Sequence, residues 1–569
     1  MSQPNRPKLS RQMGLMTLTA TGVCSMLGAS INVVPFMIQR NVPGIGPYVL
    51  PAFAFAAIPA IFAALAYAIL SSAMPRAGGS YIYVSRGLNP SLGFVASFSQ
   101  WFGLSIVIGV IAYLSIPFLR DISVALGWEN VSKILEIPFV RVSLALFLIW
   151  YFVWINIKGA KSYVSILLPM MFLMLALGAI VIVTGFTFNS QDFMTALKSK
   201  ENRIFKSTYI SFDWHIFFSA SALLFSSFIG FDSISQAGSE AKNPTNSLPK
   251  AILLAVFLVS VFYFLFTGAV YHTVPWSFVA AEAAKKDISA PGLLSYVIPK
   301  ELSVAILLGA SIALINDLPA MLLSVSRLMF AWAEDGIFPN FISRVHPQKK
   351  TPYIAIAVGG LIASLGVLGA HFAGDFFLGI DIMVTSMMIN FLLICITLIC
   401  IPKINPLLAD QISVIKNRRL QLWIGWLGSL FLTGFLFGFG FYLCGIFWIT
   451  YSLTFDDSFK FLIPVALIFI PFFLSIFTGL TTLMVGRFLS YNFSSILLFS
   501  GAFALSDYLR SKILTGFPWN LWSYSWSWLT EVLQPLNLIG LFAFNLLVIT
   551  IFTIPAILFF KTSFSKKIL

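Results

Sequence analysis

The chain has 569 residues, of which 59% are hydrophobic and only 10% charged, with a mean hydropathy of +0.92 and a formal net charge of +14. A soluble domain carries about 25% charged residues, so this composition excludes a soluble globular protein. The basic residues lie between apolar runs, where they orient a membrane protein and require no nucleic acid partner.

Apolar runs of roughly 20 residues, the length that a helix needs to cross a bilayer, recur along the chain. We expect ten spans at residues 15–38, 47–72, 91–118, 140–157, 163–187, 215–236, 250–272, 302–333, 352–371 and 376–401. After a polar, basic stretch at 403–420, four more spans are expected at 422–450, 460–485, 493–510 and 533–560. The sequence therefore predicts an all-α polytopic membrane protein without a separate cleavable signal peptide.

The distribution of basic residues predicts that both termini are cytoplasmic. Arg6, Lys8 and Arg11 precede the first span, and an even number of spans returns the basic C-terminal tail to the same side. The loop at 188–214 departs from the positive-inside pattern, since its four basic residues would face outward. Longer loops follow the rule weakly, so the prediction is kept.

Two spans carry helix-weakening residues near their middle: GASINVVP at 28–35 in the first and FSSFIGFDSISQAG at 225–238 in the sixth. Irregular backbone within the bilayer survives only against protein or a water-filled site, because unpaired N–H and C=O groups in hydrocarbon are costly. Small residues there also suit close helix packing. Two interrupted helices five spans apart, however, are typical of an inverted-repeat transporter with a site at the membrane midplane.

Four segments resemble the amino acid–polyamine–organocation superfamily of permeases. They are GASINVVP (28–35), LSSAMPRAGGSYIYVSRGLNPSLGFVASFSQW (70–101), FIGFDSISQAGSEAKNP (228–244) and SRLMFAWAEDGIFPNFISRVHPQKKTPYIA (326–355), in family order. The resemblance implies a LeuT-like core of ten helices in two inverted five-helix repeats, with about four helices added. It also implies a secondary transporter of an amino acid or related amine in a bacterial cytoplasmic membrane, not an enzyme, and no cofactor is expected. We expect a transport core at 1–402, a cytoplasmic basic linker at 403–420 and a four-helix membrane appendage at 421–569.

The broken helices suit the two charged groups of an amino acid. The break in the first helix leaves amide N–H groups unpaired where the half-helix dipole favours a carboxylate, and carbonyl groups freed in the sixth helix can accept bonds from an ammonium. Ser30 stands where relatives carry glycine, which argues for a small substrate or a shifted pose, although its hydroxyl is equally able to bond back to its own helix. By resemblance, the substrate-binding residues are Met26, Gly28, Ala29, Ser30, Ser226, Ser227, Ile229 and Gly230.

Three polar residues within the spans are candidates for ion or proton coupling: Asp232, Asn316 and Asp317. A carboxylate inside the membrane is costly and is by default a functional candidate. Relatives usually carry Glu at the position of Asp232, and sodium-coupled relatives use hydroxyl oxygens where Asn316 and Asp317 stand. We expect a proton in preference to sodium as the coupling cation. The alternative for both carboxyl groups is a structural pairing with a buried polar neighbour. Charged residues near the span ends, Glu240 and Arg327 among them, are interpreted as exposed loop charges.

The last third resembles the membrane part of bacterial apolipoprotein N-acyltransferase, especially the TGFPWN run at 515–520. That enzyme acts through a separate nitrilase-like domain with a Cys nucleophile, and no cysteine follows Cys444 here, so we expect a catalytically inactive appendage, fused or truncated. An acyltransferase-like protein and a non-transporting, receptor-like relative are the alternative functions. The four cysteines show no metal-ligand spacing, and no metal site is expected.

Overall fold

The computed structural model describes residues 9–203, 210–286, 288–373, 376–429, 432, 493–513 and 536–553. The chain divides into two compact units, Met1–Ser429 and Leu430–Leu569. Within the described ranges the regular structure is helical apart from two isolated backbone bridges, and ten helical segments are long and apolar enough to cross a membrane. These ten coincide with the ten spans expected between residues 15 and 401, so the all-α polytopic fold is confirmed.

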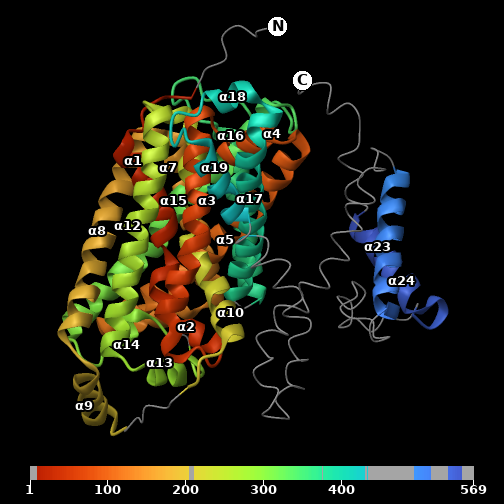
Figure 1. The fold of residues 1–569 in the computed structure, drawn as a ribbon. Helices are drawn as coiled ribbons and strands as arrows, with labels where there is room; N and C mark the ends of the chain where they lie inside the picture. The colour runs from red at the N-terminus through yellow and green to blue at the C-terminus, as the bar shows by residue number, and fades with distance from the viewer. Residues whose placement is uncertain are drawn as a thin grey trace. The chain divides into compact units, whose positions relative to one another are not determined.

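The first unit is a bundle of long helices joined by short ones (Figure 1). The first span consists of α1 (Leu15–Leu27) and α2 (Ala29–Asn41), and the sixth of α10 (Trp214–Leu224), the 3₁₀ turn η2 (Phe225–Phe228) and α11 (Ser233–Gln236). The other spans are α3 (Val49–Ala73, preceded by η1, Gly46–Tyr48), α5 (Pro90–Ala125), α7 (Pro138–Lys158), α8 (Ala160–Thr187), α12 (Pro244–Thr273), α15 (Lys300–Glu334), α16 (Tyr353–Ala373) and α17 (Phe376–Ile404).

The connecting helices gather at the two ends of this bundle. Near the end where α1 begins lie α4 (Gly79–Gly87), η3 (Gly238–Glu240), α18 (Pro406–Asp410) and α19 (Arg418–Ser429). At the opposite end lie α9 (Ser190–Glu201), α13 (Trp276–Ala283) and α14 (Ala290–Leu294), while α6 (Glu129–Glu136) joins α5 to α7. We call these the α4 end and the α13 end of the bundle.

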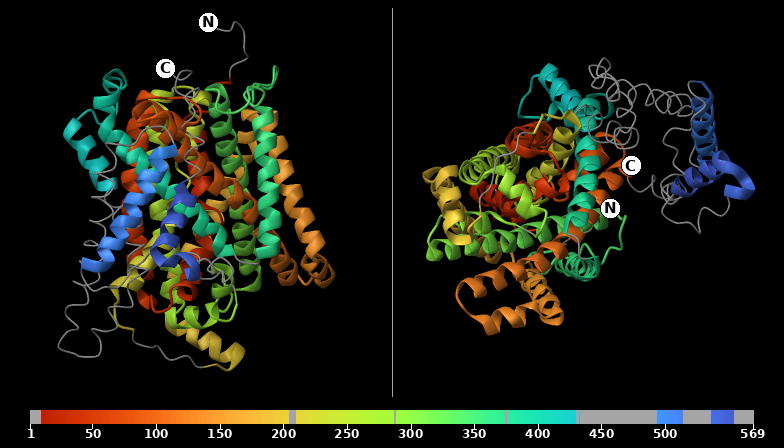
Figure 2. Two further views of the ribbon diagram at one scale, coloured as in Figure 1. Left: turned by 90° about the vertical axis from the view of Figure 1, so that its right-hand side faces the viewer. Right: turned by 90° about the horizontal axis from the view of Figure 1, so that it is seen from below.

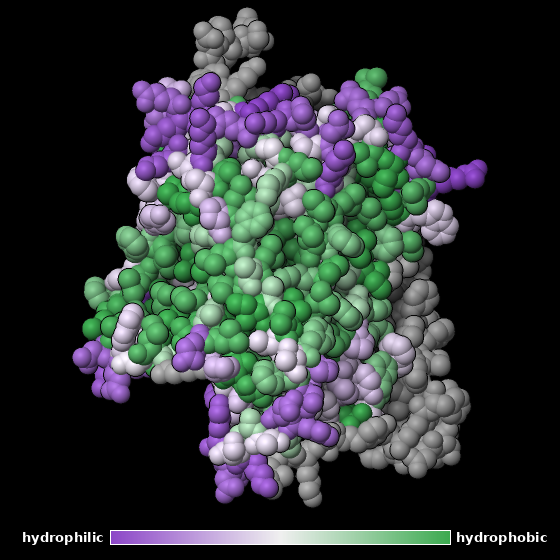
Figure 3. Space-filling view, turned by 90° about the vertical axis from the view of Figure 1, so that its left-hand side faces the viewer, coloured by the Kyte–Doolittle hydropathy of each residue, from purple (hydrophilic) through white to green (hydrophobic). Residues whose placement is uncertain are grey.

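The surface of the first unit carries a broad apolar band between polar ends (Figure 3). Large side chains of the spans are well exposed, as for Phe147 (64%) of α7, Phe257 (65%) of α12 and Leu365 (65%) of α16. Such a surface is unstable in water and stable in hydrocarbon, which fits helices that lie in a bilayer.

The two interrupted spans lie in the interior. The first span is 94% buried over its most apolar stretch, the eighth (α15) 78% and the sixth 72%, and these three are the most buried of the ten. Seen from below, the first span lies inside the other helices of the unit (Figure 2, right). The bundle therefore shields the irregular backbone of both interruptions from lipid, as an irregular segment at membrane depth requires.

The segment after the tenth span is only partly described. Helix α19 packs on α17 and α3, and the Arg418 guanidinium donates to the carbonyl oxygens of Leu398 (3.0 Å) and Ile399 (2.6 Å). In the second unit, α23 (Phe493–Ile513) packs on α24 (Leu536–Thr553), and Asn545 donates to Asp507 (2.9 Å). The spans expected at 422–450 and 460–485, and the TGFPWN run, lie almost wholly outside the described residues, and the expected boundaries at 402/403 and 420/421 stay predictions.

Candidate functional site

The first span is interrupted at Gly28. Its backbone (φ −54°, ψ −124°) is not helical, and it separates the end of α1 from the start of α2. One carbonyl freed by the interruption is satisfied by a side chain, because the Tyr263 hydroxyl of α12 donates to the carbonyl oxygen of Met26 (2.8 Å). Gly28 itself offers no side chain to cap α2, and the first amide groups of any helix point their positive ends out of it.

The sixth span is interrupted between η2 and α11. Ile229 is extended (φ −75°, ψ 132°), and Gly230 lies in the left-handed region (φ +135°), where a side chain would strain the backbone. A Cβ at Gly230 would come within 2.6 Å of the Ser25 carbonyl carbon, so the interruption packs directly against the end of α1. The structure therefore brings the two interruptions together.

Two hydroxyl groups just before this second interruption are buried without hydrogen bonds. Ser226 (2% exposed) and Ser227 (0%) lie in η2, and neither side-chain oxygen has a partner within the described residues. Buried polar groups are nearly always hydrogen-bonded, so an unbonded pair is unusual. A ligand that bonds to these hydroxyls would satisfy both.

The eighth span places Asn316 and Asp317 against the first interruption. A Cβ added at Gly28 would overlap the carboxyl group of Asp317, so the close approach depends on glycine. The Asn316 amide donates to Cys24 Sγ of α1 (2.9 Å), and both polar residues are almost fully buried (0% and 3% exposed). The Asp317 carboxyl group thus lies beside the start of α2, where a half-helix favours negative charge. We call Met26–Gly28, Ile229–Gly230, Asn316 and Asp317 the break site.

A narrow cavity borders the break site and is too small for a substrate in this structure. It has a volume of about 10 Å³, room for about one water molecule, and Leu27, Ile31 and Asn32 line it together with residues of α8, α12 and α15. Admission of a larger molecule therefore requires the helices around the interruption to move.

Asp232 belongs to a different polar cluster. The Gln100 amide of α5 donates to its carboxylate, and Gln100 also accepts from Asn390 of α17 (3.2 Å). Gln236 donates to Ser80 (2.8 Å), which shares a hydrogen bond with Tyr67 (2.6 Å). All these side chains are fully buried. We call Tyr67, Ser80, Gln100, Asp232, Gln236 and Asn390 the polar network. It links α3, α4, α5, α11 and α17.

Glu240 and Arg327 are not exposed loop charges, and that expectation was wrong. Glu240 is 3% exposed and Arg327 2%, and the guanidinium donates to Glu240 Oε1 through Nη2 (2.6 Å) and Nε (3.2 Å). In the sequence, Glu240 follows the sixth span and Arg327 lies near the end of the eighth, and charged side chains at the ends of spans are usually exposed. The missed signal was the opposite sign of the two charges, since a buried charge in a protein is nearly always paired.

The predicted site residues therefore fall into three groups. The structure places Asp317 against Gly28, Asn316 against α1, and Gly230 against Met26, with Ile229, Ser226 and Ser227 in the adjoining turn. Asp232 lies in the polar network. Ala29 and Ser30 form the first turn of α2, and their side chains lie outside what the structure describes. The roles of all these residues in binding or coupling stay predictions.

Comparison with known proteins gives a match along most of the chain. The model of the family described as amino acid permease matches residues 13–450, and that of the apolipoprotein N-acyltransferase N-terminal domain matches residues 411–554. The chain is similar to the branched-chain amino acid permease BcaP of Bacillus subtilis, with 26% identity over 368 residues, 63% of this chain and 74% of that protein.

Two further relatives are at the same level of similarity. The low-affinity putrescine importer PlaP of Escherichia coli is 25% identical over 372 residues, 64% of this chain and 76% of its own length. The methylthioribose transporter of Bacillus subtilis is 24% identical over 378 residues, 65% of this chain and 77% of its own length. With ten membrane spans and a family match over more than half of its length, the chain belongs to the amino acid permease family and is a multi-pass membrane transporter, not an enzyme.

Proposed function

We propose that the protein is a proton-coupled secondary transporter that carries an amino acid or a related amine across a bacterial cytoplasmic membrane. The observation that carries this proposal is the position of the Asp317 carboxyl group against Gly28, at the start of α2. The positive end of the α2 dipole and the titratable carboxyl group of Asp317 lie next to each other. Binding of a proton and binding of a substrate can therefore influence each other there.

The substrate site that we propose lies between the two interruptions. The first amide groups of α2, at Gly28, Ala29 and Ser30, bind the substrate carboxylate, with Met26 at the preceding turn. The carbonyl and hydroxyl groups around Ser226, Ser227, Ile229 and Gly230 accept bonds from the substrate ammonium. The unbonded hydroxyls of Ser226 and Ser227 support this assignment.

Coupling follows from competition between two carboxyl groups. When Asp317 is ionised, its charge and the dipole of α2 satisfy each other, and a substrate carboxylate is repelled. When Asp317 is protonated, the repulsion is removed and the amide groups are available to substrate. Substrate therefore binds together with one proton, and both are released on the side where the proton concentration is lower. Asp232 is the second candidate for this role, and Asn316 adds an oxygen if the cation is sodium.

The class of substrate is drawn from chemistry and from the relatives. A site with amide donors at one side and oxygen acceptors at the other fits a zwitterion, and an ionised Asp317 would instead suit an amine without a carboxylate. Relatives named for branched-chain amino acids and for putrescine represent both cases. We place both termini in the cytoplasm from the positive-inside pattern, with a transport core at 1–402, a linker at 403–420 and an appendage at 421–569.

Uptake by purified protein in liposomes tests the proposal. Radiolabelled leucine, lysine and putrescine are offered under an inward proton gradient, with and without sodium, and with a protonophore. We expect at least one compound to accumulate above its external concentration without sodium, and the protonophore to abolish the accumulation. Accumulation that requires sodium would contradict proton coupling. Failure of all compounds, together with no binding of a wider amino acid panel, would contradict the transport assignment.

A further inference from the structure

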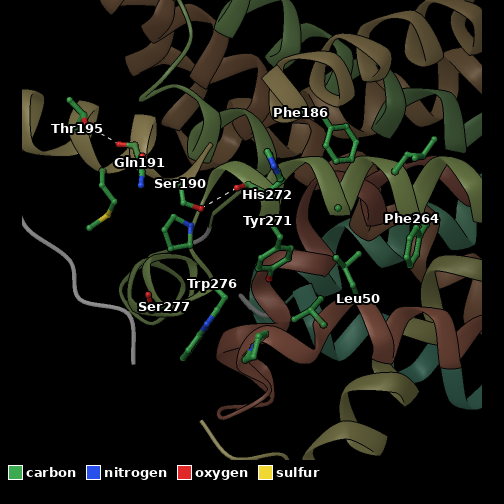
Figure 4. Close-up of a pocket in the computed structure, with 16 residues that line it drawn as sticks. Leu50, Phe186, Ser190, Gln191, Thr195, Phe264, Tyr271, His272, Trp276 and Ser277 are labelled. Atoms are coloured by element: carbon green, nitrogen blue, oxygen red, sulfur yellow. Dashed lines mark hydrogen bonds between the residues drawn. The ribbon is translucent and has the colours of Figure 1, made fainter. Parts of the chain in front are cut away.

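A large pocket lies away from the break site, near the α13 end of the bundle (Figure 4). It has a volume of about 1000 Å³ and lies where α3 begins and where α8 and α12 end, with α9 and α13 across its mouth. Cavities of this size hold small-molecule ligands in other proteins. Neither the transport proposal nor the polar network uses it. We call it the α9 pocket.

The wall of the α9 pocket is apolar and belongs to the membrane spans. Leu50 of α3, Phe186 of α8, and Phe264 and Leu265 of α12 line it. Phe186 and Phe264 are each 49% exposed, within helices that are themselves long enough to cross the bilayer. Gly268 of α12 lies between Leu50 and Phe186 in this wall, because a Cβ at this position would be 4.0 Å from both side chains, and a larger side chain would enter the space between them. Helices of this length and composition lie in hydrocarbon, which gives acyl chains access to side chains exposed along them.

The rim of the pocket is polar and lies just beyond the spans. Ser190, Gln191 and Thr195 of α9 line it, and Ser190 donates to the carbonyl oxygen of His272 at the end of α12 (3.1 Å). Lys198 follows Gln191, Met194 and Thr195 on the same face of α9, and it is exposed. The carboxylate of Asp192 on the same helix accepts from the Asn189 backbone N–H as part of the helix cap. Lys198 thus places a cation on the face of α9 that lines the rim.

We propose that the α9 pocket binds one anionic glycerophospholipid of the surrounding membrane. An acyl chain lies along the wall beside Gly268, and the phosphate lies at the rim near Lys198 and the polar side chains of α9. An apolar wall on the spans and a polar rim with Lys198 on the same helix face match the two ends of a phospholipid, and a cation near the interface favours an anionic headgroup. The pocket is thus a lipid site distinct from the transport site.

Native mass spectrometry of the purified protein tests this, with phosphatidylglycerol and phosphatidylcholine of the same acyl chains as probes. The variant Gly268→Leu fills the wall, and Gly369→Leu is its control, since Gly369 lies at a similar position near the end of α16 with nothing within 4 Å. The variant Lys198→Gln removes the cation at the rim, and Lys133→Gln removes an exposed lysine from α6.

We expect one tightly bound phosphatidylglycerol in the parent and both controls, at least tenfold weaker binding in Gly268→Leu, and loss of preference over phosphatidylcholine in Lys198→Gln. Equal binding by Gly268→Leu and Gly369→Leu, or no preference for phosphatidylglycerol in the parent, would overturn the proposal.

A phosphatidylglycerol with a photoreactive acyl chain gives an independent readout on the parent. Crosslinks in α8 or α12 around the pocket support the site, and crosslinks confined to other helices contradict it.

Discussion

Gly28 is the residue on which the proposed site depends most. Because it has no side chain, the Asp317 carboxyl group can lie against the backbone at the non-helical turn between α1 and α2. A methyl group here would displace Asp317 first, because a carboxyl group at the end of a side chain moves more easily than a backbone. The proposed site would therefore change before the fold does.

Replacement of Gly28 by alanine should reduce transport without loss of the folded protein. Overpacking of a close contact costs about 1–3 kcal/mol, so we expect uptake to fall by about tenfold or more. Gly28→Val should abolish it. Initial uptake rates in liposomes measure the effect, and gel filtration confirms that the protein remains monodisperse.

Gly14→Ala is the control for this substitution, because nothing lies within 4 Å of a Cβ at Gly14, next to the start of the same helix. It should transport like the parent. Normal uptake by Gly28→Val would show that the substrate does not approach the backbone at this residue.

What the sequence predicts and what the structure shows agree at some residues of the site and differ at others. Gly28 and Gly230 could be predicted, because helix-weakening residues inside an apolar span mark irregular backbone that must be shielded from lipid. Asp232 and Asp317 looked alike in the sequence, as acidic residues at membrane depth. Their surroundings differ, since Gln100 bonds to one and Gly28 contacts the other, and such contacts between distant spans are set by packing.

Among the elements, η3 and α15 are joined by the buried pair of Glu240 and Arg327. The segment around Glu240 also holds the start of the chain, since Met13 N–H donates to the Glu240 carbonyl oxygen (2.9 Å) and Lys242 N–H donates to that of Met13 (2.9 Å). The ion pair therefore joins the end of the interrupted sixth span to the eighth, and the two backbone bonds join it to the segment before α1. These are the spans that carry the break site.

Glu240→Gln should destabilise the protein strongly, because it leaves the Arg327 charge buried without its partner. Loss of one member of a buried ion pair costs about 3–5 kcal/mol. Arg327→Met should do the same, and the double variant should recover part of the loss. Thermal unfolding in detergent measures all three, with Glu129→Gln on exposed α6 as the control. Additive effects in the double variant would mean that the pair is not coupled.

The end of α9 is tied to α13 and to the residues just after α14 by a second charged cluster outside the spans. Arg203 donates to Glu282 of α13 (2.8 Å) and to Glu201 (3.0 Å), and the Tyr296 hydroxyl donates to Glu201 (2.8 Å). These hydrogen bonds hold the pKa of Glu201 below its ordinary value. Burial acts to raise the pKa of Glu282, but the bond from Arg203 and the charge of Lys285 outweigh it, so this pKa is also lowered.

Acid should therefore loosen α9 and α13. A carboxylate with a lowered pKa in the folded state stabilises the fold above its unfolded pKa, about 4.3 for Glu, and this contribution is lost as the pH falls through the folded pKa. We expect hydrogen exchange in α9 and α13, corrected for the intrinsic rate, to rise by about threefold below about pH 4, a modest effect because exposed pairs are weak.

The variant Glu282→Gln should remove most of this pH dependence, whereas Glu129→Gln should leave it unchanged. If the exchange of α9 is the same at pH 6 and pH 3.5, the cluster contributes nothing to the stability of this helix.

For the whole molecule, the order and length of the ten spans followed from apolar runs and basic loops alone. This worked because a bilayer demands continuous apolar helices of fixed length, whatever their partners. The arrangement of those helices was implied only through the family resemblance. The buried ion pair, the polar network and the α9 pocket could not be derived, since each depends on side chains from several spans. The second part of the chain was recognised from its local motifs, and the match to residues 411–554 agrees with that.

A chain that ends after Ser429 should still transport, because the break site lies wholly within the first compact unit. Truncation after Ser429, and not at the end of the expected linker at residue 420, keeps the whole of α19 and the contacts of Arg418 with α17. We expect uptake within about threefold of the parent, since domains with their own core fold and act separately.

Complementation of a strain without the lipoprotein acyltransferase should fail with the full chain, and successful complementation would contradict the non-enzymatic assignment.

The central claim is that Asp317 couples substrate movement to a proton, and counterflow together with accumulation in liposomes tests it most directly. Asp317→Asn keeps the size of the side chain and removes its titration. The account predicts that this variant exchanges labelled for unlabelled substrate but no longer concentrates substrate under a proton gradient, whereas Asp232→Asn still does. Accumulation by Asp317→Asn at the level of the parent, with accumulation lost in Asp232→Asn, would contradict the account and assign the coupling to Asp232.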